Sequence, residues 1–304
     1  MDELARELQS ILAKQVPLND ADLSRATVLR HRIGRTQLTP GRHSLPSAPA
    51  VDVFEGVRGV PEVNAAELTG AHVACGLRLH GALVVRGLVD PVGVDQLRGL
   101  IDGMDWSEHR YASDADGIQL PDAPPMRCTP ITLQGLIEVY LRAGMREVMT
   151  EYMGEAPVLL AERTLVDRRP LSHGLPWHQD AAFFGGGVGA VNSFLALDEC
   201  GRKAPGLMVI SHRFNELRGV GDGERSKLKY GLGLSKQEII KEAGGPEQVS
   251  EPHLQAGDAI FLDEMTFHRT GRTSKENTNA RSWAVTWFFP PSRFPEDRHP
   301  LWFG

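Results

Sequence analysis

Cysteine is scarce in this chain of 304 residues, and long apolar runs are missing from it. The three cysteines, Cys75, Cys128 and Cys200, are an odd number without paired spacing, which argues against a disulfide framework and favours a reducing compartment. No run of about 18 apolar residues occurs, so we expect no membrane span. The first residues also lack the basic start and apolar stretch of a signal peptide, and we therefore expect a cytoplasmic protein.

An excess of positive charge is absent as well. Lysine and arginine number 33 against 39 aspartates and glutamates, so the net charge is -6 and predicts no general attraction to nucleic acid. The charged share of 24% and the hydrophobic share of 41% are ordinary for a globular protein with a real core. The length allows one large domain or two small ones.

The first 64 residues differ from the rest of the chain in pattern. Apolar residues at helical spacing predict a helix over residues 1–14, and a second helix is expected after Asp20. Residues 40–64 are rich in proline, glycine and serine, which predicts an irregular linker. We therefore expect an N-terminal helical arm and linker over residues 1–64 and the main domain over residues 65–304.

Five arginines and no acid occur between residues 23 and 43. The simpler interpretation is a solvated arm, because runs of one charge usually face water. The alternative is a clamp for an anionic substrate or for a partner subunit. Whether the chain is a monomer or a homodimer stays open.

Helical patterns come first in the main domain and short strands follow. Helices are expected over residues 65–79, 91–103 and 133–152, with a buried strand over residues 82–85 between the first two. Many short strands with turn signals indicate an α+β protein whose core is a closed sandwich or jelly roll. The later strands are predicted over residues 157–166, 189–198, 206–211, 251–254, 258–263 and 281–289.

A long insertion, residues 213–250, separates two of the predicted strands. From Arg213 to Lys241 it holds seven lysines and arginines against four aspartates and glutamates, together with several glycines. Such a segment can be a lid that closes over a substrate and excludes water, or a solvated surface loop.

Two histidines and one aspartate form the pattern with the clearest chemistry. His178 and Asp180 are two residues apart, so on an extended strand both side chains would face the same side. His268 follows a turn and a buried strand at residues 257–262, and a jelly roll can bring such distant strands together. Two imidazoles and a carboxylate are the set that holds non-haem Fe(II) and leaves positions open. Zinc accepts the same ligands, and a His-x-Asp pair alone also occurs by chance.

An arginine strengthens this interpretation. Arg281 lies thirteen residues after His268 and opens a predicted strand in which it shares a face with Trp283, Val285 and Trp287. Since those neighbours are apolar, the guanidinium would point inward, where it needs an anionic partner. A ligand carboxylate held bidentately fits this need, and a core aspartate or glutamate is the alternative.

Taken together, these residues resemble the phytanoyl-CoA dioxygenase family of Fe(II)/2-oxoglutarate-dependent oxygenases. Two departures are Phe194, where the family commonly has tryptophan, and Ser211-His212 after Val209-Ile210, where the family favours Pro-Gly-Ser-His. Both concern the shape of the pocket and hence the substrate. The resembling segments are Leu79–Leu88, Trp177–Phe183, Leu195–Asp198, Gly257–Asp258, His268 and Arg281.

The resemblance implies a double-stranded β-helix, a cupin-like jelly roll with N-terminal helices packed on it. It implies iron held by His178, Asp180 and His268. It also implies 2-oxoglutarate whose distal carboxylate pairs with Arg281, assisted by Thr270.

The implied reaction uses O2 to hydroxylate an unactivated C–H bond, with release of succinate and CO2. Asp180 favours hydroxylation because related halogenating enzymes have a small residue there; desaturation, ring closure and epimerisation stay open. We expect a small organic substrate, such as an acid, an acyl-thioester or a natural-product scaffold, and the basic segments would suit an anionic one. Candidate pocket residues are Phe194, Trp283, Arg163 and Thr164.

A different class of function also fits the pattern. The chain could be a cupin-like metal-dependent isomerase, or a small-molecule binding protein without oxygen chemistry. Neither of these would bind 2-oxoglutarate or prefer iron.

Overall fold

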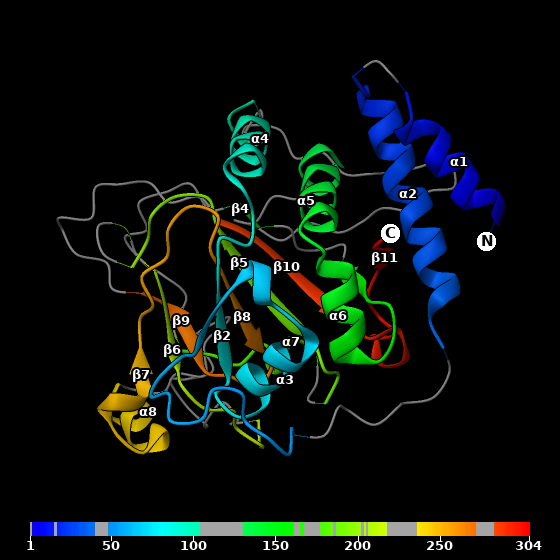
Figure 1. The fold of residues 1–304 in the computed structure, drawn as a ribbon. Coiled ribbons are helices and arrows are strands. Elements are labelled where there is room, and N and C mark those ends of the chain that lie inside the picture. Colours follow the sequence, from blue (N-terminus) through cyan, green and yellow to red (C-terminus); the bar gives the residue numbers. More distant parts are fainter. Residues whose placement is uncertain are drawn as a thin grey trace, which may run out of the picture.

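The computed structural model of the chain shows a mixed arrangement of helices and strands (Figure 1). No helix of the described part is long and apolar enough to cross a membrane. The structure describes residues 2–14, 17–39, 48–103, 130–160, 165–166, 177–184, 187–201, 204, 206–217, 236–271 and 283–304.

Two helices at the N-terminus, α1 (Asp2–Leu12) and α2 (Asp20–Gln37), pack against each other (Figure 1). The side chain of Asn19 caps α2, because its oxygen accepts a hydrogen bond from the backbone N–H of Asp22 at 2.9 Å. The apolar residues buried between the two helices are Leu8, Ile11, Ala26, Leu29 and Ile33.

Helix α2 also holds the C-terminal strand, β11 (Pro300–Trp302). The guanidinium of Arg30 donates to the backbone carbonyls of Trp302 and Gly304, both at 3.1 Å. The helices of the predicted arm therefore contact the end of the chain. The boundary expected at residue 64 stays a prediction.

The position of Arg30 corrects the expectation of a solvated arm at residues 23–43. Arg30 is only 2% exposed, and this burial lowers the pKa of its guanidinium to about 10. Arg25 on the same helix pairs with Glu7 at 2.8 Å. Arg42 lies outside the described residues. Arg30 and Arg25 therefore make contacts within the chain.

Within the described residues, the larger sheet has eight strands and is antiparallel except where β1 pairs with β2. A smaller antiparallel sheet has three strands in the order β7-β6-β9. In the larger sheet the order is β1 (Glu62–Asn64), β2 (Ala82–Arg86), β8 (Ala259–Asp263), β5 (Val191–Ala196), β10 (Trp283–Phe289), β3 (Val158–Leu160) and β11, with β4 (Leu165–Val166) beside β10. The strands of the smaller sheet are β7 (Val249–Ser250), β6 (Leu207–Ile210) and β9 (His268–Thr270).

Alternate residues of the strands face two different apolar clusters. On β5, Val191 and Leu195 pack in the cluster that includes the helices, whereas Ala196 packs in the cluster that also holds Val209 of β6. Since this second cluster joins residues of both sheets, the two sheets pack face to face. The helices that cover the other face of the larger sheet are α3 (Gly70–Arg78), α4 (Pro91–Asp102), α5 (Pro130–Arg142) and α6 (Met145–Met153) (Figure 1).

The helix predicted over residues 133–152 is two helices. Gly144 breaks it, with a φ of 71° that lies in the left-handed region. Gly154, at φ 75°, ends α6 as expected. The helix predicted over residues 65–79 likewise begins as a short 3-10 turn at Ala65–Glu67, and α3 starts only after the cap residue Thr69.

The expected strand over residues 251–254 is also wrong. Only Leu254 makes a single bridge, to Cys200, and the strand of this region is β7 just before it. Since β7 pairs with β6, the end of the predicted insertion is part of the smaller sheet. The insertion further contains α8 (Lys236–Ala243) and a 3-10 turn at Pro246–Gln248. Its residues 218–235 lie outside the described part.

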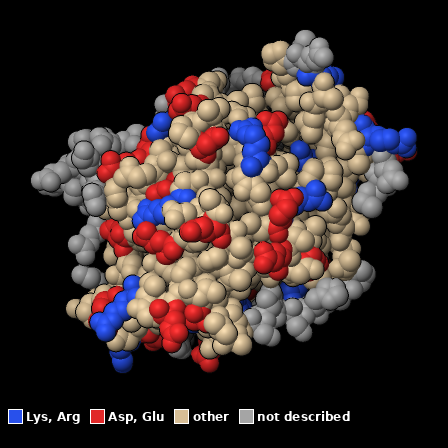
Figure 2. All heavy atoms as spheres, in the orientation of Figure 1, with Lys and Arg blue, Asp and Glu red and all other residues tan. Residues whose placement is uncertain are grey.

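Charged side chains of both signs are interspersed on the surface seen in Figure 2. The described ion pairs include Arg98 with Asp198 at 2.7 Å, and Arg86 with the largely buried Asp258 at 2.7 Å. Charges of opposite sign are therefore paired locally at these positions.

Candidate metal centre

The structure brings His178, Asp180 and His268 together in the interior. Their exposed fractions are 4%, 2% and 1%, and one ligand atom of each lies within 4.8 Å of the others. Asp180 Oδ1 is 3.7 Å from His178 Nε2 and 3.6 Å from His268 Nε2. The two imidazole rings are 4.2 Å apart between centroids.

Backbone pairing explains how residues 90 positions apart meet. His178 and His268 form an isolated antiparallel bridge, in which each backbone N–H donates to the other residue's carbonyl at 3.0 Å. His268 starts β9, whereas the chain turns at Asp180 and enters the short helix α7 (Ala181–Phe184). The predicted extended strand through both His178 and Asp180 is therefore wrong, since the turn, and not a two-residue alternation, directs the carboxylate.

Hydrogen bonds to one of its two oxygens hold the carboxylate of Asp180 in place. Its Oδ2 accepts hydrogen bonds from Asn192 Nδ2 at 2.6 Å and from Trp287 Nε1 at 3.1 Å. Its Oδ1 is the oxygen that faces the two imidazoles. A carboxylate fixed in this way presents a single oxygen to a bound ion.

Burial acts to raise the pKa of Asp180, but its neighbours reverse the effect. The facing imidazoles of His268 and His178, together with the hydrogen bonds from Asn192 and Trp287, lower its pKa below the usual value. Asp180 is therefore an ionised carboxylate at neutral pH, as a metal ligand must be.

A hydrogen bond to the backbone orients the imidazole of His268. Its Nδ1 lies 3.0 Å from the carbonyl oxygen of Thr266, so Nδ1–H donates there, and in the neutral ring Nε2 carries the lone pair. Nε2 is the atom that faces Asp180. The ring thus has the tautomer that a metal ligand requires.

These donors fit one divalent ion. Atoms bound at about 2.1 Å to a shared ion are separated by about 3 to 4 Å, and both distances to Asp180 Oδ1 fall in that range. Two nitrogens and one oxygen are the facial set of non-haem iron, and zinc accepts them as well. The donor chemistry therefore suits the iron that the resemblance implies, without excluding zinc.

Of the other predicted site residues, three are described by the structure and three lie outside the described part. Phe194 lies with its ring 6.0 Å from that of His268 and 6.0 Å from that of Trp283, so both aromatic residues lie at the His268 side of the site. Thr270 is 5% exposed and two residues after His268 on β9, which places both on one face. Arg281, Arg163 and Thr164 lie outside the described residues, and their roles stay predictions.

Sequence reasoning missed Asn192 and the hydrogen-bonding role of Trp287. Asn192 stands two residues before Phe194 on β5, so it shares the inner face with it. A polar residue on a strand face whose other residues, Phe194 and Ala196, are apolar was the available signal. Its second amide atom, Oδ1, is buried with no hydrogen-bond partner among the described residues, which marks the site as a polar one.

Solved structures share this fold at low sequence identity. EctD from S. alaskensis in its apo form aligns with a TM-score of 0.51 at 15% identity, covering 83% of this chain and 83% of that chain. The same protein with 2-oxoglutarate and 5-hydroxyectoine gives a TM-score of 0.50 at 15% identity, covering 83% and 82%. The epimerase SnoN, in complex with Fe3+, alpha ketoglutarate and nogalamycin RO, gives 0.47 at 17% identity, covering 74% and 83%. No protein-family model and no curated protein sequence matches the chain.

Proposed function

We propose that the chain is an Fe(II)/2-oxoglutarate-dependent oxygenase of the phytanoyl-CoA dioxygenase type, with a double-stranded β-helix core. The observation that carries the proposal is the buried His178, Asp180 and His268 group, in which one carboxylate oxygen is fixed and the other faces both imidazoles. The shared fold with EctD, which has been solved with 2-oxoglutarate, supports it.

Each placed residue has a part in this function. His178, Asp180 and His268 would hold the iron, and Asn192 and Trp287 orient the carboxylate. When bound, the iron supplies the redox chemistry by which O2 oxidises both 2-oxoglutarate, to succinate and CO2, and the substrate.

The remaining groups serve the co-substrate and the cavity. Phe194 lies beside His268 and Trp283 lies beside Phe194, so the two rings would form an apolar wall that excludes water. Arg281 and Thr270 would bind the distal carboxylate of 2-oxoglutarate, because a guanidinium pairs bidentately with it.

Hydroxylation of a C–H bond is the reaction that we propose for this site. The carboxylate at Asp180 fills the position that a halide would need, which favours oxygen transfer over halogenation. The proposed substrate is a small organic molecule, such as an acid, an acyl-thioester or a natural-product scaffold. Desaturation, ring closure and epimerisation are alternative reactions of the same kind of centre.

The test of this function is anaerobic addition of Fe(II) and 2-oxoglutarate. The wild-type protein should develop the weak visible charge-transfer band of the chelated complex, and Asp180→Ala should not. Asp198→Ala is the matched control, because Asp198 is paired with Arg98 away from the centre and should keep the band. A wild-type protein that binds metal without this band would be the cupin-like isomerase or binding protein instead.

A second arm tests the co-substrate anchor. Arg281→Ala should keep the Fe(II) affinity but raise the 2-oxoglutarate concentration needed for half-maximal band intensity, by about 30-fold or more, since a charge-paired hydrogen-bonding group is removed. An unchanged requirement would assign Arg281 another role.

A further inference from the structure

The residues directly before both histidines are buried in one apolar cluster. Trp177 precedes His178 and Phe267 precedes His268, and the two pack in the same cluster as Phe214. The rings of Phe214 and Phe267 meet edge to face, with centroids 4.8 Å apart. The cluster also contains Ile210 of β6 and two residues of α8, Ile239 and Ala243.

Three of these residues, Phe214, Ile239 and Ala243, come from the insertion between β6 and β8. Phe214 lies in its first residues, 213–217, which we call the insertion root, and α8 lies near its end. Trp177 and Phe267, each next to a histidine ligand, therefore pack in one cluster with side chains of the insertion, which lies between the predicted strands. Through this packing, the insertion stabilises the two backbone segments that carry His178 and His268.

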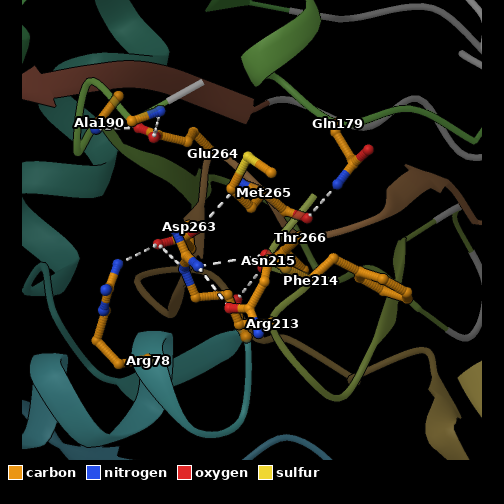
Figure 3. A network of polar contacts seen from close by, with 12 residues as sticks. Arg78, Gln179, Ala190, Arg213, Phe214, Asn215, Asp263, Glu264, Met265 and Thr266 are labelled. Carbon is orange, nitrogen blue, oxygen red and sulfur yellow. Dashed lines mark hydrogen bonds and ion pairs between the residues drawn. The ribbon is translucent and has the colours of Figure 1, made fainter. Parts of the chain in front are cut away.

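Hydrogen bonds of Gln179 also connect the ligand-bearing segments with the insertion root. Gln179, between His178 and Asp180, is fully buried and donates through Nε2 to the carbonyl oxygen of Met265 at 2.7 Å. The same nitrogen donates to the carbonyl oxygen of Glu216 at 3.2 Å. One side chain thus joins the His178 segment, the turn before His268 and the insertion root, as Figure 3 shows for Gln179 and Met265.

Arg213 connects the insertion root to that turn a second time. Its Nε donates to Asp263 Oδ2 at 2.9 Å, and both side chains are largely buried (Figure 3). The other oxygen, Asp263 Oδ1, accepts from the backbone N–H of Met265 at 2.8 Å. The carbonyl of Asp263 accepts from the N–H of Thr266 at 3.0 Å. This turn presents the Thr266 carbonyl that orients His268.

We propose that the insertion root is a structural part of the metal centre, and that Gln179 and Arg213 are positioning residues that hold the two ligand-bearing segments at the spacing one ion needs. This rests on the proposed function, since it concerns the same ion. Without the Gln179 amide, the two segments lose their direct side-chain link. Without Arg213, the cation left beside the Asp263 carboxylate among the described residues is Arg78, at 3.7 Å, and the turn that orients His268 loses its connection to the insertion root.

The experiment measures metal affinity in the full-length protein. Metal-free wild type, Gln179→Met and Arg213→Gln are titrated with Co(II) in the absence of 2-oxoglutarate, and the visible Co(II) spectrum reports the coordination geometry. Both variants should bind about tenfold to a hundredfold more weakly, the loss usual when a group that orients a ligand is removed. Arg213→Lys, which keeps a cation near Asp263, should recover part of the affinity.

Two controls separate this role from a loss of stability. Arg86 pairs with Asp258 immediately before β8, whereas Arg213 pairs with Asp263 at the other end of the same strand, so Arg86→Gln is matched to Arg213→Gln. Gln134, a buried glutamine that contacts Arg30, gives Gln134→Met as the match for Gln179→Met. Each control should lower the unfolding midpoint while leaving Co(II) affinity within about twofold of wild type.

The outcomes distinguish this inference from the proposed function. If wild type binds Co(II) and the two variants bind it as tightly as their controls, the insertion root does not position the ligands. If wild type binds no metal, the proposed function itself fails. Should Gln179→Met not fold, the comparison of Arg213→Gln with Arg213→Lys and Arg86→Gln decides the question.

Discussion

Two carboxylates of this protein are equally buried and have opposite acid–base behaviour. Asp180 is 2% exposed and Glu264 is 1% exposed. The pKa of Asp180 is lowered by two imidazoles and two side-chain donors. Burial raises the pKa of Glu264 to about 7, and the neighbouring Asp263 adds to this, although backbone amides and Arg213 act in the opposite direction.

The difference shows that neighbours, more than burial, decide what a buried carboxylate can do. Asp180 is surrounded by groups that favour its charge, so it can serve as a ligand. Glu264 accepts hydrogen bonds from the backbone N–H groups of Gly187 and Ala190, the latter at 2.5 Å, and so ties the chain after α7 to the end of β8. Its place is in the framework around the centre, seen at the top of Figure 3.

The largest effect that we expect from this comparison concerns the pH dependence of stability. The pKa of Glu264 rises from 4.5 to about 7 on folding, so the folded state binds the proton more tightly than the unfolded state. Its contribution to stability is complete below pH 4.5 and is lost as the pH rises through 7, by about 3 kcal/mol in all. Glu264→Gln should remove this slope in urea unfolding of the metal-free protein. Parallel stability curves for variant and wild type across this window would contradict the assignment.

A smaller effect is expected where the support of Asp180 is removed. Asn192→Leu keeps the branching of the side chain but deletes the donor to Asp180 Oδ2. Metal affinity should fall about tenfold to a hundredfold, because the carboxylate can then rotate away from the imidazoles. Calorimetric titration of the metal-free protein measures it.

Tyr140→Phe is the control for the opposite face of β5, where Tyr140 of α5 contacts Ser193. It deletes the hydrogen bond between Tyr140 and Ser193, which is 2.9 Å long and fully buried. The free energy of unfolding should fall by about 1 kcal/mol with metal affinity unchanged. Equal metal affinities in both variants would remove the distinction between the two faces of β5.

The smallest effect is expected for Trp287→Phe. The longer hydrogen bond of Trp287 to Asp180, at 3.1 Å, is lost while the aromatic ring largely remains. Metal affinity should fall about threefold to tenfold. If this variant weakens binding more than Asn192→Leu does, then packing of the indole, and not its N–H, holds the carboxylate.

Much of the local structure followed from the sequence. The strands at 82–85 and 258–263 were predicted close to their observed bounds, and so was the helix after Pro91, where Asp90 caps α4. Inward alternation along residues 283–287 is also observed, since Trp283, Val285 and Trp287 share one cluster. The break at Gly144 was missed because an apolar stripe alone does not show where the backbone leaves the helix.

By itself the sequence determined the types of ligand and the periodicity of the strands that carry the apolar core, because both are written in neighbouring residues. Only the tertiary structure decided that Asn192 orients Asp180, that Gln179 contacts Glu216, and that Arg30 fixes the end of the chain. Contacts of this kind join segments that are remote along the chain. Their partners are selected by how the sheets and helices pack, which no local pattern of residues encodes.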